Sequence, residues 1–218
     1  MTEQTTDEIP FFPAPAPPAL ADAAAVRRML LPVLDDLADV VGAVTADDLA
    51  RPTPCSDYDV AALRAHVLGW LDLFGVCFTD GGRRQDRPDP AAFEVPADPA
   101  DVVRTARGRF AAALDAGVLD GEVVMSASRM SGPGATGMVL GEYVVHGWDL
   151  ATALGRPWAP PAEAVATAHE FFAGVVVPEY RGPDGGFFLD EVEVDHDAPA
   201  LDRLLAFAGR DPGWTPPA

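Results

Sequence analysis

The sequence contains no lysine, and all fifteen of its basic residues are arginine. This absence excludes Schiff-base enzymes and P-loop nucleotide-binding proteins, since both depend on a lysine amine. Basic residues are also few beside the 34 acidic ones, which gives the 218-residue chain a formal net charge of −19. A surface of that charge repels nucleic acids and anionic membranes, so we expect neither as a partner.

Cysteine is scarce too, and the features of an exported or membrane protein are missing. Cys55 and Cys77 are too few for a disulfide scaffold, and neither lies in a CxxC pair. The N-terminal residues lack the basic region and the apolar core of a signal peptide. The longer apolar segments are interrupted, and none is convincing as a membrane span. Together these absences favour a cytoplasmic protein.

The chain divides by composition into two parts. Residues 1–19 are rich in proline and predict a disordered or extended leader, whereas residues 20–218 hold enough apolar residues for a single domain.

Apolar residues at helical spacing predict four long helices followed by two more. Their ranges are about 20–44, where Pro32 marks a kink or a late start, then 59–80, 99–117, 134–155, 162–177 and 200–208. We expect a weakly structured connection over 117–134 and a strand or extended arm over 187–195. The predicted fold class is mostly all-α, an antiparallel four-helix bundle with short extra helices and a minor extended segment near the C-terminus.

The fourth predicted helix carries the most informative pattern. Glu142, His146 and Asp149 follow the spacing i, i+4, i+7 and therefore share one face, and no other charged residue lies between Thr136 and Gly155. A carboxylate and an imidazole one turn apart can reach the same metal ion. If the face points inward, the two carboxylates and the histidine need a cation. The opposite face is apolar or small, so an amphipathic helix that exposes the stripe to water is the alternative.

A metal site needs a ligand from another helix, and His66 in the second predicted helix is the best candidate. With Glu142 and His146 it forms a His₂Glu set, which leaves a coordination position open, as catalytic zinc sites do. The same set suits the facial triad of ferrous iron. A histidine beside an apolar stripe can also be a satisfied core or boundary residue.

Three segments carry a resemblance to a known family. Residues 52–60 (PTPCSDYDV) with 66–69 (HVLG), residues 142–151 (EYVVHGWDLA) and residues 204–212 (LLAFAGRDP) resemble its motifs. It is an actinobacterial metal-binding family of the DinB-like superfamily, and it includes mycothiol-dependent maleylpyruvate isomerase. The similarity spans roughly residues 20–214.

The resemblance implies a DinB-like four-helix bundle that holds a divalent metal through His66, Glu142 and His146. The metal is usually zinc, with nickel, manganese or iron as other options, and mycothiol is the implied cosubstrate. Asp149 would orient a ligand imidazole or accept a proton, with a helix cap or loop contact as the alternative. Arg210, in the third motif, would bind an anionic group of the cofactor, or else form a local salt bridge or cap.

We therefore expect an enzyme that activates a low-molecular-weight thiol for S-transfer to, or isomerisation of, a small electrophile. Two other functions are open. One is a hydrolase that uses metal-activated water, and the other is a non-catalytic metal- or ligand-binding protein of a biosynthetic pathway. A bundle of this kind is compatible with a homodimer.

The remaining histidines and cysteines carry weaker signals. Cys55, just before the second helix, could approach the site, although a buried structural thiol is the simpler interpretation. We expect Cys77 in the core, His169 at the boundary of the core, and His196 exposed.

Overall fold

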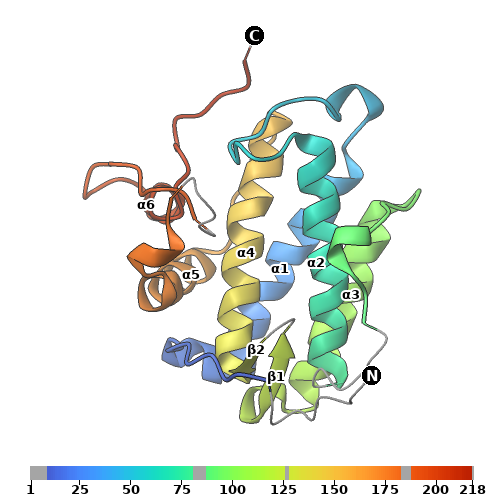
Figure 1. Ribbon diagram of the computed structural model, residues 1–218, viewed down its shortest axis with the longest axis vertical. Coiled ribbons are helices and arrows are strands. Elements are labelled where there is room, and N and C mark those ends of the chain that lie inside the picture. Colours follow the sequence, from blue (N-terminus) through green and yellow to red (C-terminus); the bar gives the residue numbers. More distant parts are fainter. Residues whose placement is uncertain (1–8, 81–86, 126–127, 183–187, 218) are drawn as a thin grey trace.

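The structure is a computed structural model and describes residues 9–80, 87–125, 128–182 and 188–217. Over these residues the chain is mostly helical, so the all-α class is confirmed (Figure 1). The helices are α1 (Ala23–Gly42), α2 (Val60–Asp80), α3 (Pro99–Asp115), α4 (Gly132–Ala153), α5 (Ala162–Val175) and α6 (Ala200–Phe207). A hairpin of β1 (Glu122–Met125) and β2 (Ser128–Ser131) lies near the N-terminal end of α4.

One hydrophobic core lies between the four long helices. α1 packs against α3 and α4, and α2 packs against the same two helices. Leu34, Leu63, Phe110 and Leu140, one from each helix, are 0 to 1% exposed. Burying large side chains of this kind stabilises a fold by about 1.5–3 kcal/mol each, which explains why the helical periodicity of the sequence predicts these elements well.

α1 continues through Pro32 and does not begin there. A proline inside a helix removes one backbone hydrogen bond and costs about 3 kcal/mol. Here the flanking residues Leu30, Val33, Leu34 and Leu37 are almost completely buried, and their burial outweighs that cost. The expectation of a late helix start is therefore wrong.

α2 begins where its sequence predicts, because the Asp59 carboxylate accepts a hydrogen bond from the Ala62 amide at 2.8 Å. The helix is long and apolar enough to meet the length and composition of a membrane span. However, 61% of the relevant window is buried inside the fold, as expected of a core helix.

The segment before α4 is more ordered than its glycine and serine content predicts. Val123 and Met130 pair across the hairpin, and both are buried. The expectation of a weakly structured connection is wrong, because the buried face of Val123 to Met125 anchors this segment to the core.

Residues 9–17, which we call the N-terminal strap, lie extended along the hairpin. The Phe12 amide donates to the Arg129 carbonyl at 2.7 Å, and the Arg129 amide donates to the Pro10 carbonyl at 2.8 Å. Phe12, Ala14 and Ala16 pack against the core. Residues 1–8 of the predicted leader lie outside the described residues.

α4 is buried on nearly all sides, and aromatic rings lie directly on its glycines. A Cβ atom added at Gly141 would come within 2.4 Å of the Phe172 ring, and one at Gly147 within 2.2 Å of the Trp158 ring. Glycine at these positions lets α5 and the segment before it approach the α4 backbone closely. The interpretation of α4 as a helix with a solvated polar face is therefore wrong.

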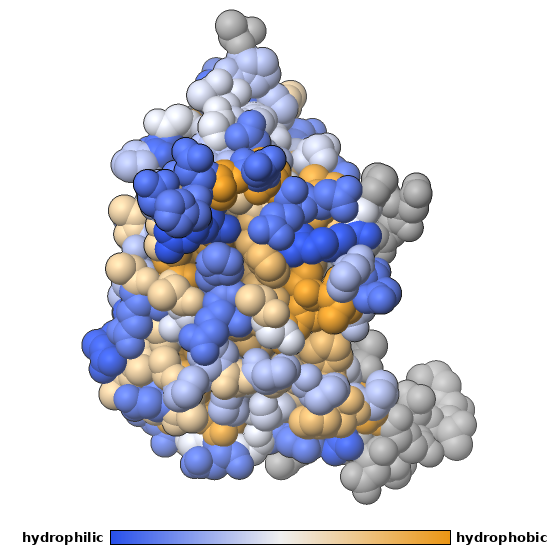
Figure 2. Space-filling view, turned by 90° about the vertical axis from the view of Figure 1, so that its left-hand side faces the viewer, coloured by the Kyte–Doolittle hydropathy of each residue, from blue (hydrophilic) through white to orange (hydrophobic). Residues whose placement is uncertain are grey.

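The chain after α5 packs against α5 on one side of the molecule. Phe188 lies against Phe172, with ring centroids 5.2 Å apart, and forms an isolated bridge with Arg181. Residue 187 lies outside the described residues, and 189–195 form an arm without regular structure, so an extended arm describes this segment better than a strand. Figure 2 views the side that carries α5 and α6, where hydrophobic residues are visible between hydrophilic ones.

Candidate metal centre

Two imidazole nitrogens converge on one carboxylate oxygen between α2 and α4. Nε2 of His66 lies 3.5 Å from Oε1 of Glu142, and Nε2 of His146 lies 3.3 Å from the same oxygen. One ligand atom from each of the three side chains lies within 4.8 Å of the other two. The helical spacing of the α4 pair and the position of His66 in the middle of α2 bring these atoms together, as the sequence predicts. Their role as metal ligands stays a prediction.

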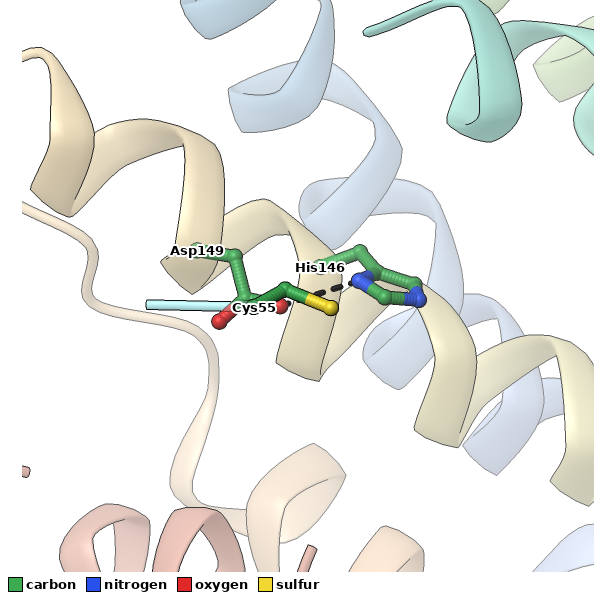
Figure 3. Close-up of side chains that lie close together, drawn as sticks. All are labelled: Cys55, His146 and Asp149. Carbon is green, nitrogen blue, oxygen red and sulfur yellow. Dashed lines mark hydrogen bonds and ion pairs between the residues drawn. The ribbon is translucent and has the colours of Figure 1, made fainter. Parts of the chain in front are cut away.

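Both imidazoles are held through their other nitrogen. Nδ1 of His146 lies 2.9 Å from Oδ2 of Asp149, one turn further along α4 (Figure 3). Nδ1 of His66 lies 3.3 Å from the hydroxyl of Tyr58, in the loop before α2. Such contacts fix the ring orientation of metal-binding histidines and direct Nε2 toward the ion. Asp149 thus contacts the imidazole of a candidate ligand, and its role in orienting that ligand stays a prediction.

The charges of the cluster shift the pKa values of its members. Burial by itself would raise the pKa of Glu142, but the charges and hydrogen bonds of His146 and His66 outweigh burial and lower it. Burial would lower the pKa of His146, but the charge of Glu142 and the hydrogen bond to Asp149 outweigh it and raise the pKa to about 9. Without a metal, His146 is therefore protonated at neutral pH.

The donor chemistry of the cluster fits a divalent cation. His146 has a carboxylate at each ring nitrogen, and an ionised carboxylate only accepts hydrogen bonds. A neutral imidazole has one N–H, so one of the two contacts would place lone pair against lone pair unless a proton or a metal ion lies there. Imidazole nitrogens and a carboxylate oxygen are ligand types that zinc accepts. The residues present therefore fit a metal ion bound between His66, Glu142 and His146.

Arg210, near the C-terminus, forms an ion pair with Asp149 beside the cluster. Its Nη2 and Nε lie 3.2 and 3.4 Å from Oδ2 of Asp149, and its Nη1 donates to the Ala208 carbonyl at 2.9 Å. Arg210 is 6% exposed and Asp149 is 0% exposed, so this is a buried ion pair. The ion pair is not local, since its partner lies 61 residues earlier, whereas the bond to the Ala208 carbonyl is the local cap at the end of α6. Binding of a cofactor anion by Arg210 stays a prediction.

Cys55 lies beside the cluster as a buried thiol. Its Sγ is 3.3 Å from Nη2 of Arg210. Burial raises its pKa to about 11, because the opposing effect of Arg210 is smaller. Cys55, His146 and Asp149 form a second group whose ligand atoms lie close together. Oδ2 of Asp149 is already shared by His146 and Arg210, and the Arg210 guanidinium contacts the Cys55 sulfur, so a cation bound here would lie against an existing positive charge. This second group is therefore less suited to a metal than the first.

A cavity of about 800 Å³ opens onto the cluster. His66, Glu142, His146 and Arg210 all contribute to its wall. Small-molecule sites typically measure about 300–1,000 Å³, so the cavity can hold a substrate in contact with the three candidate ligands.

The other singled-out residues lie away from the cluster. Cys77 is fully buried, the partly buried His169 packs 5.4 Å from the Phe207 ring, and the His196 side chain is 97% exposed. These three expectations are confirmed. Tyr58 is the residue that sequence reasoning missed, because its contact with His66 depends on how the loop before α2 folds.

Comparison with known proteins agrees with the motifs. Residues 30–151 match the family model described as the mycothiol maleylpyruvate isomerase N-terminal domain. Two relatives, uncharacterized proteins from two strains of Mycobacterium tuberculosis, are each 31% identical over 180 residues. The aligned region covers 81% of this chain and 92% of each relative. No solved structure gives a significant match.

Proposed function

Because the chain belongs to the family of the mycothiol maleylpyruvate isomerase N-terminal domain, we propose that it is a divalent-metal-dependent thiol transferase or isomerase. It would activate a low-molecular-weight thiol of the mycothiol type for attack on a small electrophile. One observation carries the proposal: Nε2 of His66, Nε2 of His146 and Oε1 of Glu142 converge at the wall of a substrate-sized cavity.

His66, Glu142 and His146 would hold the metal, with zinc as the first choice, on a DinB-like bundle made of α1 to α4. A dication bound by three protein ligands keeps a position open for a thiol and lowers the pKa of that thiol. The family's association with mycothiol favours this chemistry over the hydrolysis of an ester or amide.

The chain's own residues prepare the site for that chemistry. Tyr58 and Asp149 fix the two imidazole rings through their Nδ1 atoms. Arg210 lines the cavity and pairs with Asp149, which stabilises the carboxylate that contacts His146. Cys55 keeps its proton at neutral pH and therefore does not compete with the thiol as a nucleophile.

The first test is metal content, measured by elemental mass spectrometry on tag-free protein. We expect about one divalent ion per chain in the wild type, and none in His66→Ala or His146→Ala. His169→Ala is the matched control, because His169 lies outside the cavity and should leave the metal in place. Equal metal content in all four proteins would refute the ligand assignment.

The second test is thiol transfer to monochlorobimane, an uncharged electrophile. The thiol sulfur forms a C–S bond as the C–Cl bond breaks, and chloride and the thiol proton leave to solvent. We expect mycothiol to react faster with the metal-loaded protein than without protein, and His146→Ala to abolish the difference. Ester hydrolysis without any thiol would favour a hydrolase, and bound metal without turnover of either kind would indicate a binding protein.

A further inference from the structure

The polarity of the cavity wall changes along α4. Met138, Glu142 and His146 follow one another at four-residue spacing, so each lies about 6 Å further along the same face of the helix. All three line the cavity, with the methionine toward the hairpin and the histidine toward Arg210. The cavity thus has one end at the candidate metal ligands, which is polar, and a second end beside β1 and β2.

The end beside the hairpin is mostly apolar, with Ser128 of β2 as its polar member. Met125 of β1 and Met130 of β2 line it, and Phe12 of the N-terminal strap joins them through the backbone pairing with Arg129. Further along the cavity, beside Gly141 of α4, Phe172 and Phe188 add two rings in edge-to-face contact to the wall. Flexible methionine side chains and aromatic rings form surfaces that adapt to apolar ligands of varied shape.

The charges of the described cavity wall disfavour an anionic group at the end beside the hairpin. Among the described lining residues, the permanent cation is Arg210, and its guanidinium already bonds Asp149 and the Ala208 carbonyl. Asp57 and Glu142 add negative charge to the same wall. At the end beside the hairpin, an anionic group would lose its hydration without gaining an unpaired cation among the described lining residues, which is unfavourable.

From these observations we infer that the end of the cavity beside the hairpin is a subsite for an uncharged apolar or aromatic group, with Phe12 as a specificity-determining residue. The inference rests on the proposed function in assigning this group to the electrophile. Phe12 and Phe11 then differ in role. Phe12 lines the cavity, while Phe11 is 46% exposed and does not.

The subsite can be tested on metal-free protein with two fluorescent probes of one skeleton. N-phenyl-1-naphthylamine is uncharged, and 8-anilinonaphthalene-1-sulfonate adds an anionic group. We expect the uncharged probe to bind at least about tenfold more tightly, since His146 and Arg210, the cations among the described lining residues, are already paired with Glu142 and Asp149. Phe12→Ala should weaken the uncharged probe about tenfold, the effect of losing roughly 50 Å² of apolar contact, and Phe11→Ala should not change it.

Met138→Arg provides a test that does not depend on the strap. Met138 is partly exposed, so an arginine there can keep its charge hydrated while it reaches the cavity. We expect this variant to reverse the preference in favour of the sulfonate probe. Equal binding of the two probes to the wild type, or equal effects of Phe11→Ala and Phe12→Ala, would overturn the inference.

The test separates the subsite from the metal centre. His146→Ala should lose metal and keep the uncharged probe if both proposals hold. Metal binding with no probe binding would refute the subsite alone, and probe binding in a protein that never takes up metal would refute the metal centre alone.

Discussion

Replacing Asp149 with asparagine should affect both the stability of the fold and the affinity for metal, because one oxygen of Asp149 serves both. Oδ2 of Asp149 contacts both Nδ1 of His146 and the guanidinium of Arg210. Asparagine has the same shape and removes the charge, so Arg210 is left buried without its counter-charge. Breaking a buried ion pair costs about 3–5 kcal/mol. Arg210 keeps its bond to the Ala208 carbonyl, so we expect the lower end, about 3 kcal/mol of the free energy of unfolding.

The second effect of Asp149→Asn concerns the metal. Loss of a partner that orients a ligand histidine typically weakens metal affinity by about 10–100-fold. The double variant Asp149→Asn/Arg210→Met removes the unpaired charge as well. It should recover most of the lost stability and still bind zinc weakly, because the support of His146 is not restored.

Urea unfolding of metal-free protein measures the first effect, and zinc competition with a chromophoric chelator measures the second. Asp72→Asn is the matched control, since it breaks an Asp–Arg pair with Arg109 whose side chains are 30% and 34% exposed. We expect it to cost at most about 1 kcal/mol and to leave zinc affinity unchanged. Equal stability losses in the two single variants, or wild-type zinc affinity in the double variant, would refute this account of Asp149.

Three further predictions follow from burial and packing. In metal-free protein, the raised pKa of His146 stabilises the fold fully below the ordinary pKa of 6.5, and this stabilisation is lost as pH rises through about 9. Denaturation curves between pH 6 and 10 should show the loss, and His146→Gln should abolish this pH dependence. A thiol pKa of about 11 instead of 9.0 should slow alkylation of Cys55 by iodoacetamide at pH 8 about 100-fold relative to an unperturbed thiol, as followed by peptide mass spectrometry. Gly141→Ala should lower thermal stability, because its Cβ would meet the Phe172 ring at 2.4 Å, whereas Gly108→Ala, with nothing within 4 Å, should raise it by about 0.5–1 kcal/mol.

The features that the sequence predicts best are local ones. Helical periodicity and the Asp59 cap define α2 closely, and the spacing of Glu142 and His146 places both on one face of α4. Such patterns depend on neighbours within a turn or two, which the sequence lists directly.

The features that it predicts poorly depend on distant contacts. The pairing of Arg210 with Asp149 joins residues 61 positions apart, and the hydrogen bond between Tyr58 and His66 depends on how a loop folds. The β1–β2 hairpin and the N-terminal strap are stabilised by burial against the core, which composition alone does not reveal. Propensity is a weak guide wherever tertiary packing decides the conformation.

The glycines of α4 limit how far this protein can be truncated and still fold. Each glycine inside a helix costs about 0.5–1 kcal/mol relative to alanine, so α4 is a poor helix by itself and depends on the rings that lie on it. Those rings, Trp158, Phe171 and Phe172, all follow residue 151, where the family match ends. A fragment that ends at residue 151 would contain all three candidate ligands but would lack the aromatic side chains that stabilise α4. The segment that matches the family model thus contains the three candidate ligands, and the chain after it supplies the packing that stabilises their helix.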